Sequence, residues 1–155
     1  MERLLITGVD RPLGANLARA LADRCDVLGL YRDYAVECDG LQTAYWPGGD
    51  PLSLRNHWQQ WQPHWMIHCG PLAESSWDRP LLGTAHDESG LVAALVELTA
   101  GSATRLTVVS SDLVFTGPRL FHEETASPTS ITADALQARG VEQTLSRTSA
   151  LVVRT

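Results

Sequence analysis

Short apolar runs alternate with stretches of helical periodicity along the whole chain. Each run is only a few residues long and has little internal alternation, which is typical of strands that are buried on both faces of a parallel sheet. The third run is the weakest of the set. The runs that we predict as strands are Arg3–Thr7, Asp26–Tyr31, Leu41–Trp46, His64–Cys69, Arg105–Ser110 and Ala150–Arg154.

Helices are predicted between most of these strands. Prolines mark the first residue of two of them, Pro12 and Pro51, since proline at the first helical position loses no hydrogen bond. Two more are predicted from about Asp87 to Ala100 and from about Thr132 to Ser146. Strands separated by helices predict an α/β fold with a parallel sheet. Right-handed crossovers then favour the doubly wound Rossmann arrangement, with six strands in the order 3-2-1-4-5-6.

The size and composition of the chain suit one globular domain. With 155 residues, 44% of them apolar, we expect a single Rossmann-like domain over residues 1–155 and no separate substrate domain. The net charge of -6 argues against a nucleic-acid partner or a membrane surface. The three cysteines contain no C-x-x-C pair, and the first apolar run is too short for a signal peptide or membrane span, so we expect a reduced, cytoplasmic protein.

A turn between the first strand and the first helix is the main candidate for cofactor binding. Gly8 permits a tight turn, and Gly14 permits close approach of helix and strand. The N–H groups of the helix start, including that of Leu13, would hold a pyrophosphate. Arg11 takes the middle position of a G-x-x-G-x-x-G pattern, where it either crowds the pyrophosphate or pairs with it. The alternative is a plain strand-to-helix turn without a ligand.

Further cofactor contacts are expected where other strands end. Arg32 follows the second strand, where an arginine favours NADP over NAD; the alternative is a solvated arginine. Asp50 follows the third strand and could border an adenine, or could instead cap the next helix. Cys69, Gly70 and Ser110 lie at the carboxyl ends of the fourth and fifth strands, where ligands bind in such sheets. No metal site is expected, because His64 and His68 on one strand have no further ligand nearby in sequence; we expect packing or hydrogen bonding from them.

Residues 109–117 read VSSDLVFTG. This segment resembles the S-[ST]-D-x-V-F-x-G segment of the dTDP-4-dehydrorhamnose reductase family, within the extended short-chain dehydrogenases. Residues 121–128, 140–143 and 151–155 resemble later parts of the same family. The likeness extends over the whole chain but over only the first half of a typical family member.

The resemblance implies hydride transfer between a nicotinamide cofactor and a keto-sugar nucleotide. It assigns Ser111 to polarise the substrate carbonyl, beside a tyrosine that donates a proton and a lysine that assists it. Aligning Glu142 with the family's glutamate places Asp134 and Ala138 at the tyrosine and lysine positions, and the chain contains no lysine. A carboxylate ionised at neutral pH cannot readily donate a proton, and acid–base catalysis typically contributes ~10²–10⁴-fold.

Three functions follow as hypotheses. The first is a non-catalytic domain that acts by binding a dinucleotide, a sugar nucleotide or a protein partner, including a second copy of itself. The second is an active NADP-dependent reductase that uses Ser111 and an unrecognised acid. The third is a scaffold that has lost cofactor binding as well.

Overall fold

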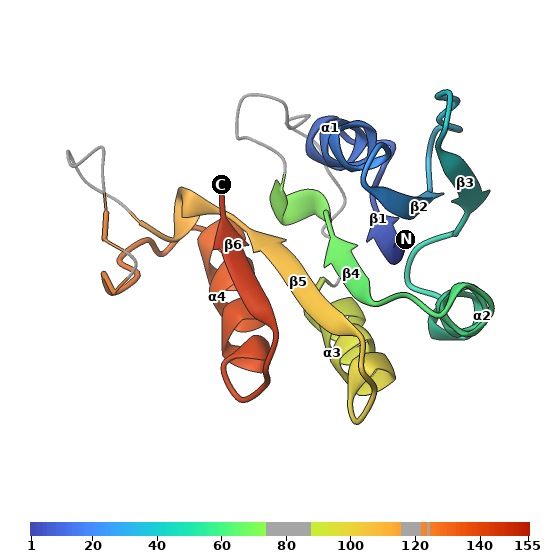
Figure 1. The fold of residues 1–155 in the computed structure, drawn as a ribbon. Coiled ribbons are helices and arrows are strands. Elements are labelled where there is room, and N and C mark those ends of the chain that lie inside the picture. The colour runs from blue at the N-terminus through green and yellow to red at the C-terminus, as the bar shows by residue number, and fades with distance from the viewer. Residues whose placement is uncertain (74–87, 116–121, 124) are drawn as a thin grey trace.

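The computed structural model describes residues 1–73, 88–115, 122–123 and 125–155, and its centre is a six-stranded parallel sheet (Figure 1). The strand order is β3-β2-β1-β4-β5-β6, which confirms the predicted Rossmann-like topology. Each predicted strand is present, and β3 and β4 are shorter than their apolar runs. The strands are β1 (Glu2–Thr7), β2 (Cys25–Tyr31), β3 (Gln42–Tyr45), β4 (Trp65–His68), β5 (Arg105–Ser110) and β6 (Leu151–Arg154).

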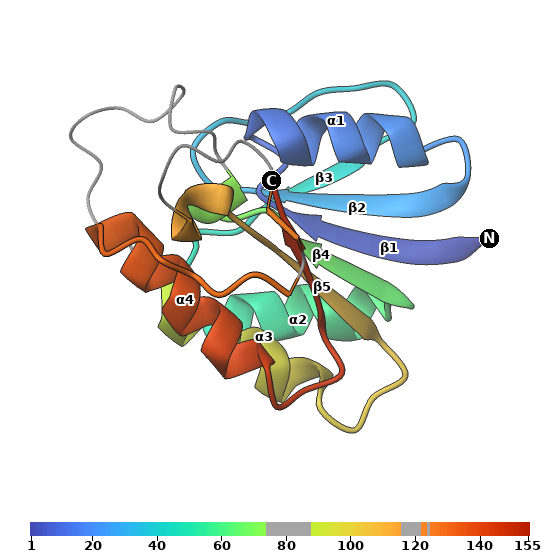
Figure 2. The same ribbon diagram turned by 90° about the vertical axis from the view of Figure 1, so that its left-hand side faces the viewer.

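Helices cover the two faces of the sheet unequally. One face carries α1, and the other carries α2, α3 and α4 (Figure 2). The helices are α1 (Pro12–Leu21), α2 (Pro51–Trp61), α3 (Glu88–Thr99) and α4 (Ala133–Leu145), with short 3-10 turns η1 (Pro71–Ala73) and η2 (Asp112–Val114). The predicted first residues of α1 and α2 are confirmed, and α3 and α4 agree with their predicted bounds to within one residue at each end. None of the helices in the described ranges is long and apolar enough to traverse a bilayer.

Local capping explains where two of the helices begin. Asp50 precedes α2, and its side chain accepts a hydrogen bond from the Leu52 N–H at 3.0 Å. Thr132 precedes α4 in the same way and accepts from the Ala135 N–H at 3.3 Å. Each side chain satisfies a backbone donor that the first turn of a helix leaves without an internal partner.

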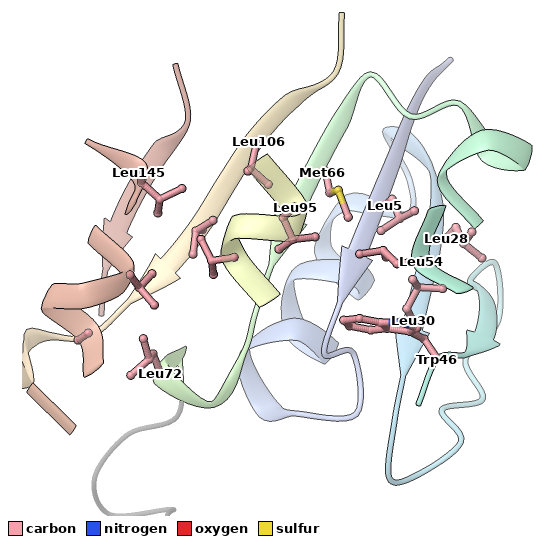
Figure 3. Close-up of a cluster of buried hydrophobic side chains, with 14 of the residues drawn as sticks. Leu5, Leu28, Leu30, Trp46, Leu54, Met66, Leu72, Leu95, Leu106 and Leu145 are labelled. Atoms are coloured by element: carbon pink, nitrogen blue, oxygen red, sulfur yellow. The ribbon is translucent and has the colours of Figure 1, made fainter. Parts of the chain in front are cut away.

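The two sheet faces bury separate apolar clusters because strand side chains alternate between them. Leu5 of β1 belongs to the cluster beneath α2, α3 and α4 (Figure 3), whereas its neighbours Leu4 and Ile6 belong to the cluster beneath α1. Burying each such side chain contributes about 1.5–3 kcal/mol. Three of the tryptophans, Trp58, Trp61 and Trp65, are partly buried against these clusters.

One face of the edge strand β6 is open. Val152 and the preceding Ala150 pack against the cluster on the α4 side. The alternate residues Leu151 and Val153 are 58% and 40% exposed. Within the described part of the chain, no helix covers this second face of β6, so two apolar side chains lie in contact with solvent.

Candidate nucleotide-binding site

A cavity of about 530 Å³ lies at the carboxyl ends of β1, β2, β3 and β4. In doubly wound sheets, this edge is where ligands bind. Residues after four strands and from the first turn of α3 line it. They include Thr7, Gly8, Asp10, Arg11, Leu30, Arg32, Trp46, Pro47, Gly48, Gly49, Pro51, His68, Cys69, Gly70, Pro71, Glu88, Gly90 and Leu91. Of the predicted cofactor contacts, the cavity brings together Gly8, Arg11, Arg32, Cys69 and Gly70.

The turn between β1 and α1 has the geometry that its glycines predict. Gly8 has a φ of 78°, and a Cβ there would overlap the carbonyl oxygen of Cys69. A Cβ on Gly14 would in turn overlap the carbonyl oxygen of Gly8, so α1 starts in direct contact with the turn. Leu13 packs its side chain against the cluster beneath α1, which leaves only its backbone to face a ligand.

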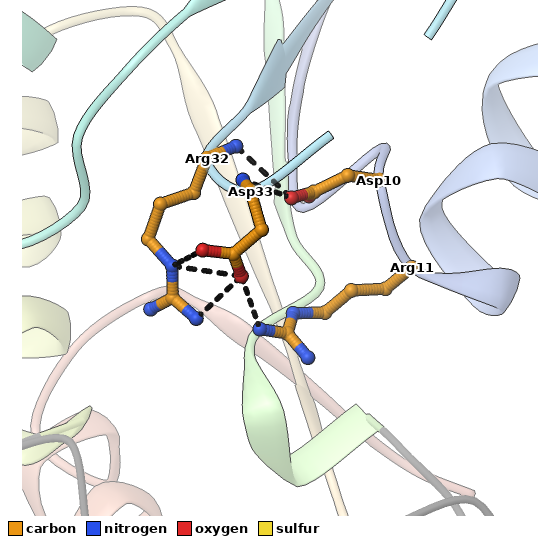
Figure 4. A network of polar contacts seen from close by, with 4 residues as sticks. All are labelled: Asp10, Arg11, Arg32 and Asp33. Atoms are coloured by element: carbon orange, nitrogen blue, oxygen red, sulfur yellow. Dashed lines mark hydrogen bonds and ion pairs between the residues drawn. The ribbon is translucent and has the colours of Figure 1, made fainter. Parts of the chain in front are cut away.

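Two arginines and two aspartates form a network beside this turn (Figure 4). Asp10 accepts hydrogen bonds from the N–H groups of Arg32 and Asp33 at 3.0 and 2.7 Å and so ties the turn to the end of β2. Asp33 Oδ2 lies 2.9 Å from Arg32 Nη2 and 3.4 Å from Arg11 Nη2. The other oxygen of Asp10, Oδ1, is buried and has no hydrogen-bond partner among the described residues.

The network is electrically balanced. The pKa of Arg32 lies above its ordinary value, and the largest cause is the hydrogen bond from its guanidinium to Asp33. The Arg32 guanidinium therefore stays charged. Two guanidinium groups and two carboxylates nevertheless sum to no net charge. An incoming phosphate therefore meets a carboxylate as well as two cations. Sequence reasoning missed Asp33, although its position just after the second strand and beside Arg32 was a usable signal.

A buried polar chain lies along one wall of the cavity. The Thr7 hydroxyl and His68 Nδ1 are 2.6 Å apart, and His68 Nε2 lies 3.1 Å from Glu88 Oε1. Both His68 and Glu88 are only 2% exposed. A Cβ on Gly70 would overlap Glu88 Oε1, so glycine at this position allows the pair to form. These hydrogen bonds link β1, β4 and α3, and they confirm the hydrogen-bonding role expected of His68.

Cys69 and Asp50 have structural surroundings that limit what they can do. Burial raises the pKa of the Cys69 thiol to about 12, which keeps it protonated and unreactive at neutral pH. Asp50 caps α2, as its alternative interpretation predicted, and only its neighbours Gly49 and Pro51 line the cavity.

His64 Nδ1 accepts a hydrogen bond from the Arg3 N–H at 2.9 Å. Among the described residues, no three histidine, cysteine or acidic side chains are grouped so as to hold a metal ion.

Ser110 and Ser111 lie outside the lining of this cavity. The Ser110 hydroxyl donates to Glu142 Oε1 at 2.8 Å, and Arg154 contacts the two Glu142 oxygens at 2.8 and 2.7 Å. Burial alone would raise the pKa of Glu142, but the bonds from Arg154 and Ser110 outweigh it and hold that pKa below its ordinary value. Ser111 is 3% exposed and accepts from the Leu113 N–H at 3.3 Å.

The positions aligned with the family's tyrosine and lysine differ in their surroundings. Asp134 is exposed on the first turn of α4, and Ala138 is fully buried in the cluster beneath the helices. His122 is exposed and stacks on Phe115, with the ring centroids 4.2 Å apart. Thr116 and Gly117 of the family-like segment, together with Phe121 and Glu124, lie outside the described residues.

Comparison with solved structures identifies the same fold in proteins described as epimerases, dehydratases, reductases and dehydrogenases. A Methylobacillus flagellatus protein described as an NAD-dependent epimerase/dehydratase matches with a TM-score of 0.76 at 20% identity, over 99% of this chain and 53% of that one. The Bordetella bronchiseptica enzyme WbmG, in complex with NAD and UDP, matches with a TM-score of 0.73 at 15% identity, over 98% and 51%. A Sulfolobus tokodaii protein described as a hypothetical dTDP-4-dehydrorhamnose reductase matches with a TM-score of 0.70 at 21% identity, over 98% and 55%.

These likenesses establish a Rossmann-like fold, since the identities are low. The chain spans about half the length of the structures that it matches. No protein-family model and no curated protein matches the sequence.

Proposed function

We propose that this chain is a nucleotide-binding Rossmann domain, related to sugar-nucleotide dehydrogenases, that binds a nicotinamide dinucleotide without catalysing hydride transfer by itself. The cavity at the carboxyl edge of the sheet carries the proposal, because it adjoins the N-terminus of α1 and the close-packed Gly8 turn. Solved structures of the same fold that contain NAD support it.

The residues around the turn have distinct roles in this proposal. The backbone at the start of α1, including the N–H of Leu13, faces the pyrophosphate, and the flexible Arg11 guanidinium lies beside it. Asp33 accepts hydrogen bonds from the adenosine ribose. We infer NAD as the preferred cofactor, which reverses the preference that Arg32 alone suggests. The reason is that Asp33 already engages the Arg32 guanidinium and would repel a 2′-phosphate.

The chemistry at the family's proton-donor position supports the proposal that this chain does not catalyse hydride transfer by itself. Asp134 is exposed to solvent and Ala138 is an apolar side chain within the core. Ser111, the residue assigned to polarise a carbonyl, is almost fully buried. A second candidate function is a reductase that uses Ser111 and another acid. His122 is the candidate for that acid, because it stacks on Phe115, the residue just after η2.

Calorimetric titration with NAD⁺ and NADP⁺ tests cofactor binding. We expect the natural chain to bind NAD⁺ more tightly than NADP⁺. The Asp33→Asn variant should bind NAD⁺ about tenfold more weakly, so that its affinities for NAD⁺ and NADP⁺ become similar. Asp39→Asn is the matched control, since Asp39 is exposed like Asp33 but is not part of the network that Asp33 forms with Arg11 and Arg32, the two arginines of the cavity lining. Tighter binding of NADP⁺ than NAD⁺ would contradict the cofactor assignment, and no binding at millimolar concentration would contradict the function.

A turnover assay with NADH or NADPH and a 4-keto sugar nucleotide tests the non-catalytic assignment. We expect no oxidation of the cofactor above the rate without protein. Oxidation that is lost in Ser111→Ala and retained in Ser146→Ala, an exposed serine at the end of α4, would establish the reductase instead.

A further inference from the structure

The cavity presents two unlike surfaces that come from opposite faces of the sheet. Leu30, Trp46 and Leu91 belong to or pack against the apolar cluster beneath α2 and α3. Asp10 and Arg11 lie at the start of α1, which covers the other face. One side of the cavity can therefore take a flat apolar ring, and the other can take a polyanion with its ribose. These are the two parts of an adenine nucleotide.

The polar residues between these surfaces hold the cavity in shape. His68 and Glu88 form their buried pair against Thr7, which fixes the first turn of α3 close to the end of β1. Leu91 is one turn further along the same helix. The Arg32 side chain packs against Gly48 in the cavity lining, where an added Cβ would lie only 2.7 Å from its Cδ.

The residues that the family resemblance places near the nicotinamide half of the cofactor do not offer free polar groups to a ligand. The Ser110 hydroxyl is committed to Glu142, and Ser111 is 3% exposed with its hydroxyl oxygen engaged by Leu113. Ala138 presents a methyl group to the core rather than a group that could bind a ribose. Among the described residues, the cavity lining includes none from β5, η2 or α4.

From this contrast we propose that the site recognises the adenosine diphosphate portion of its ligand and gains nothing from the nicotinamide. This inference rests on the proposed function and deepens it. The chain is then a receptor for adenine nucleotides in general, and ADP and ADP-ribose compete with NAD⁺ for the same cavity. Its response follows the total concentration of adenine nucleotides and not the redox state of the nicotinamide.

Calorimetry with a set of ligand fragments tests the inference. ADP-ribose and NAD⁺ are expected to bind with affinities within about threefold of each other, ADP within about tenfold, and nicotinamide mononucleotide not at all. UDP is the control for the base, because it keeps the diphosphate and replaces adenine. The inference is overturned if NAD⁺ binds more than about tenfold tighter than ADP-ribose, or if UDP binds as well as ADP.

A variant of the apolar surface provides a second test. Leu91→Trp places a larger side chain in the cavity and should weaken ADP, ADP-ribose and NAD⁺ alike, by about tenfold or more. Leu91→Phe should have a smaller effect in the same direction. Leu52→Trp, on the exposed surface of α2 and outside the cavity, is the control. Thermal unfolding verifies that each variant is folded, and unchanged ADP affinity in folded Leu91→Trp would contradict the location of the base.

The two proposals fail in different ways. If none of the adenine ligands binds, the proposed function is wrong. If NAD⁺ binds and neither ADP nor ADP-ribose does, the proposed function holds and the present inference is wrong.

Discussion

At the scale of single residues, the pairing of His68 with Glu88 is the most consequential contact of the cavity wall. Both side chains are removed from water, and each supplies the hydrogen bond that the other would lose. A buried polar group without a partner costs far more than the net gain from a satisfied bond. The pair should therefore be sensitive to loss of one member and tolerant of a replacement that still accepts a hydrogen bond.

Glu88→Ala should lower the free energy of unfolding by about 3 kcal/mol, because it leaves the His68 ring buried without its acceptor. Glu88→Gln keeps an oxygen that can accept from His68 and should cost less. Urea denaturation measures both, and Glu97→Ala on the exposed side of the same helix is the control. Equal losses in the alanine and glutamine variants would show that the hydrogen bond is unimportant.

The Glu142 carboxylate makes stability depend on pH. Because Arg154 and Ser110 hold its pKa in the folded state below the unfolded value of about 4.3, its contribution is fully present above that pH and is lost as pH falls through the folded value. Thermal unfolding between pH 6 and pH 3 should show a smaller loss of stability in Glu142→Gln than in the natural chain. A parallel decline in the two proteins would remove Glu142 from the acid response.

Residue-level prediction from sequence succeeded where geometry is local. Gly8 and Gly14 could be assigned because the turn that requires them lies within a few residues. Glu88 could not, since its contact with His68 spans twenty residues and depends on how α3 is rotated about its axis. For Asp33, the position just after the second strand was a usable signal, but its contact with Arg11 spans 22 residues and could not be read from the sequence.

At the scale of elements, the start of α2 shows that Asp50 caps the helix, whereas the sequence allowed either a cap or a contact with the adenine. Asp50 begins the helix through its bond to the Leu52 N–H, and Trp46 Nε1 donates to its carbonyl oxygen at 3.1 Å. The strands were predictable because buried parallel strands are continuous apolar runs. Their exact ends were not, since β3 and β4 each begin one residue after and end one residue before the corresponding apolar run.

Asp50→Ala should destabilise the protein by about 0.5–2 kcal/mol through loss of the α2 cap, and Asp50→Ser should restore most of that loss. Since Asp50 is absent from the cavity lining, NAD⁺ affinity should stay within about twofold of the natural chain. Chemical denaturation and calorimetry on the same samples measure the two effects. A stable variant with much weaker binding would return Asp50 to the ligand site.

At the scale of the whole molecule, the strand order followed from rules of handedness and connection that act on any alternating α/β sequence. The same right-handed rule accounts for the unequal coverage of the sheet by the described helices, with α1 on one face and α2, α3 and α4 on the other, because the chain reverses its direction across the sheet after β3 (Figure 2). What the sequence could not reveal is how far the edge strand is covered, and the structure leaves Leu151 and Val153 in contact with water.

The open face of β6 should promote self-association of this chain. Exposed apolar side chains on an edge strand favour pairing with another copy, and a charge on that face opposes it. Sedimentation should therefore detect a concentration-dependent dimer of the natural chain, and Leu151→Lys should shift the equilibrium toward monomer. Leu52→Lys, at an apolar site on α2 that is still more exposed, is the control. A natural chain that remains monomeric at high concentration would contradict this expectation.

The missing Cβ at Gly70 has an evolutionary consequence. Any side chain there would occupy the space of the Glu88 carboxylate, so a descendant of this protein cannot change residue 70 alone without a penalty. A smaller residue at 88 would have to arise first, and a larger one at 70 could then follow. The two positions should therefore vary together among homologues, and the effects of Gly70→Ala and Glu88→Ala should not add.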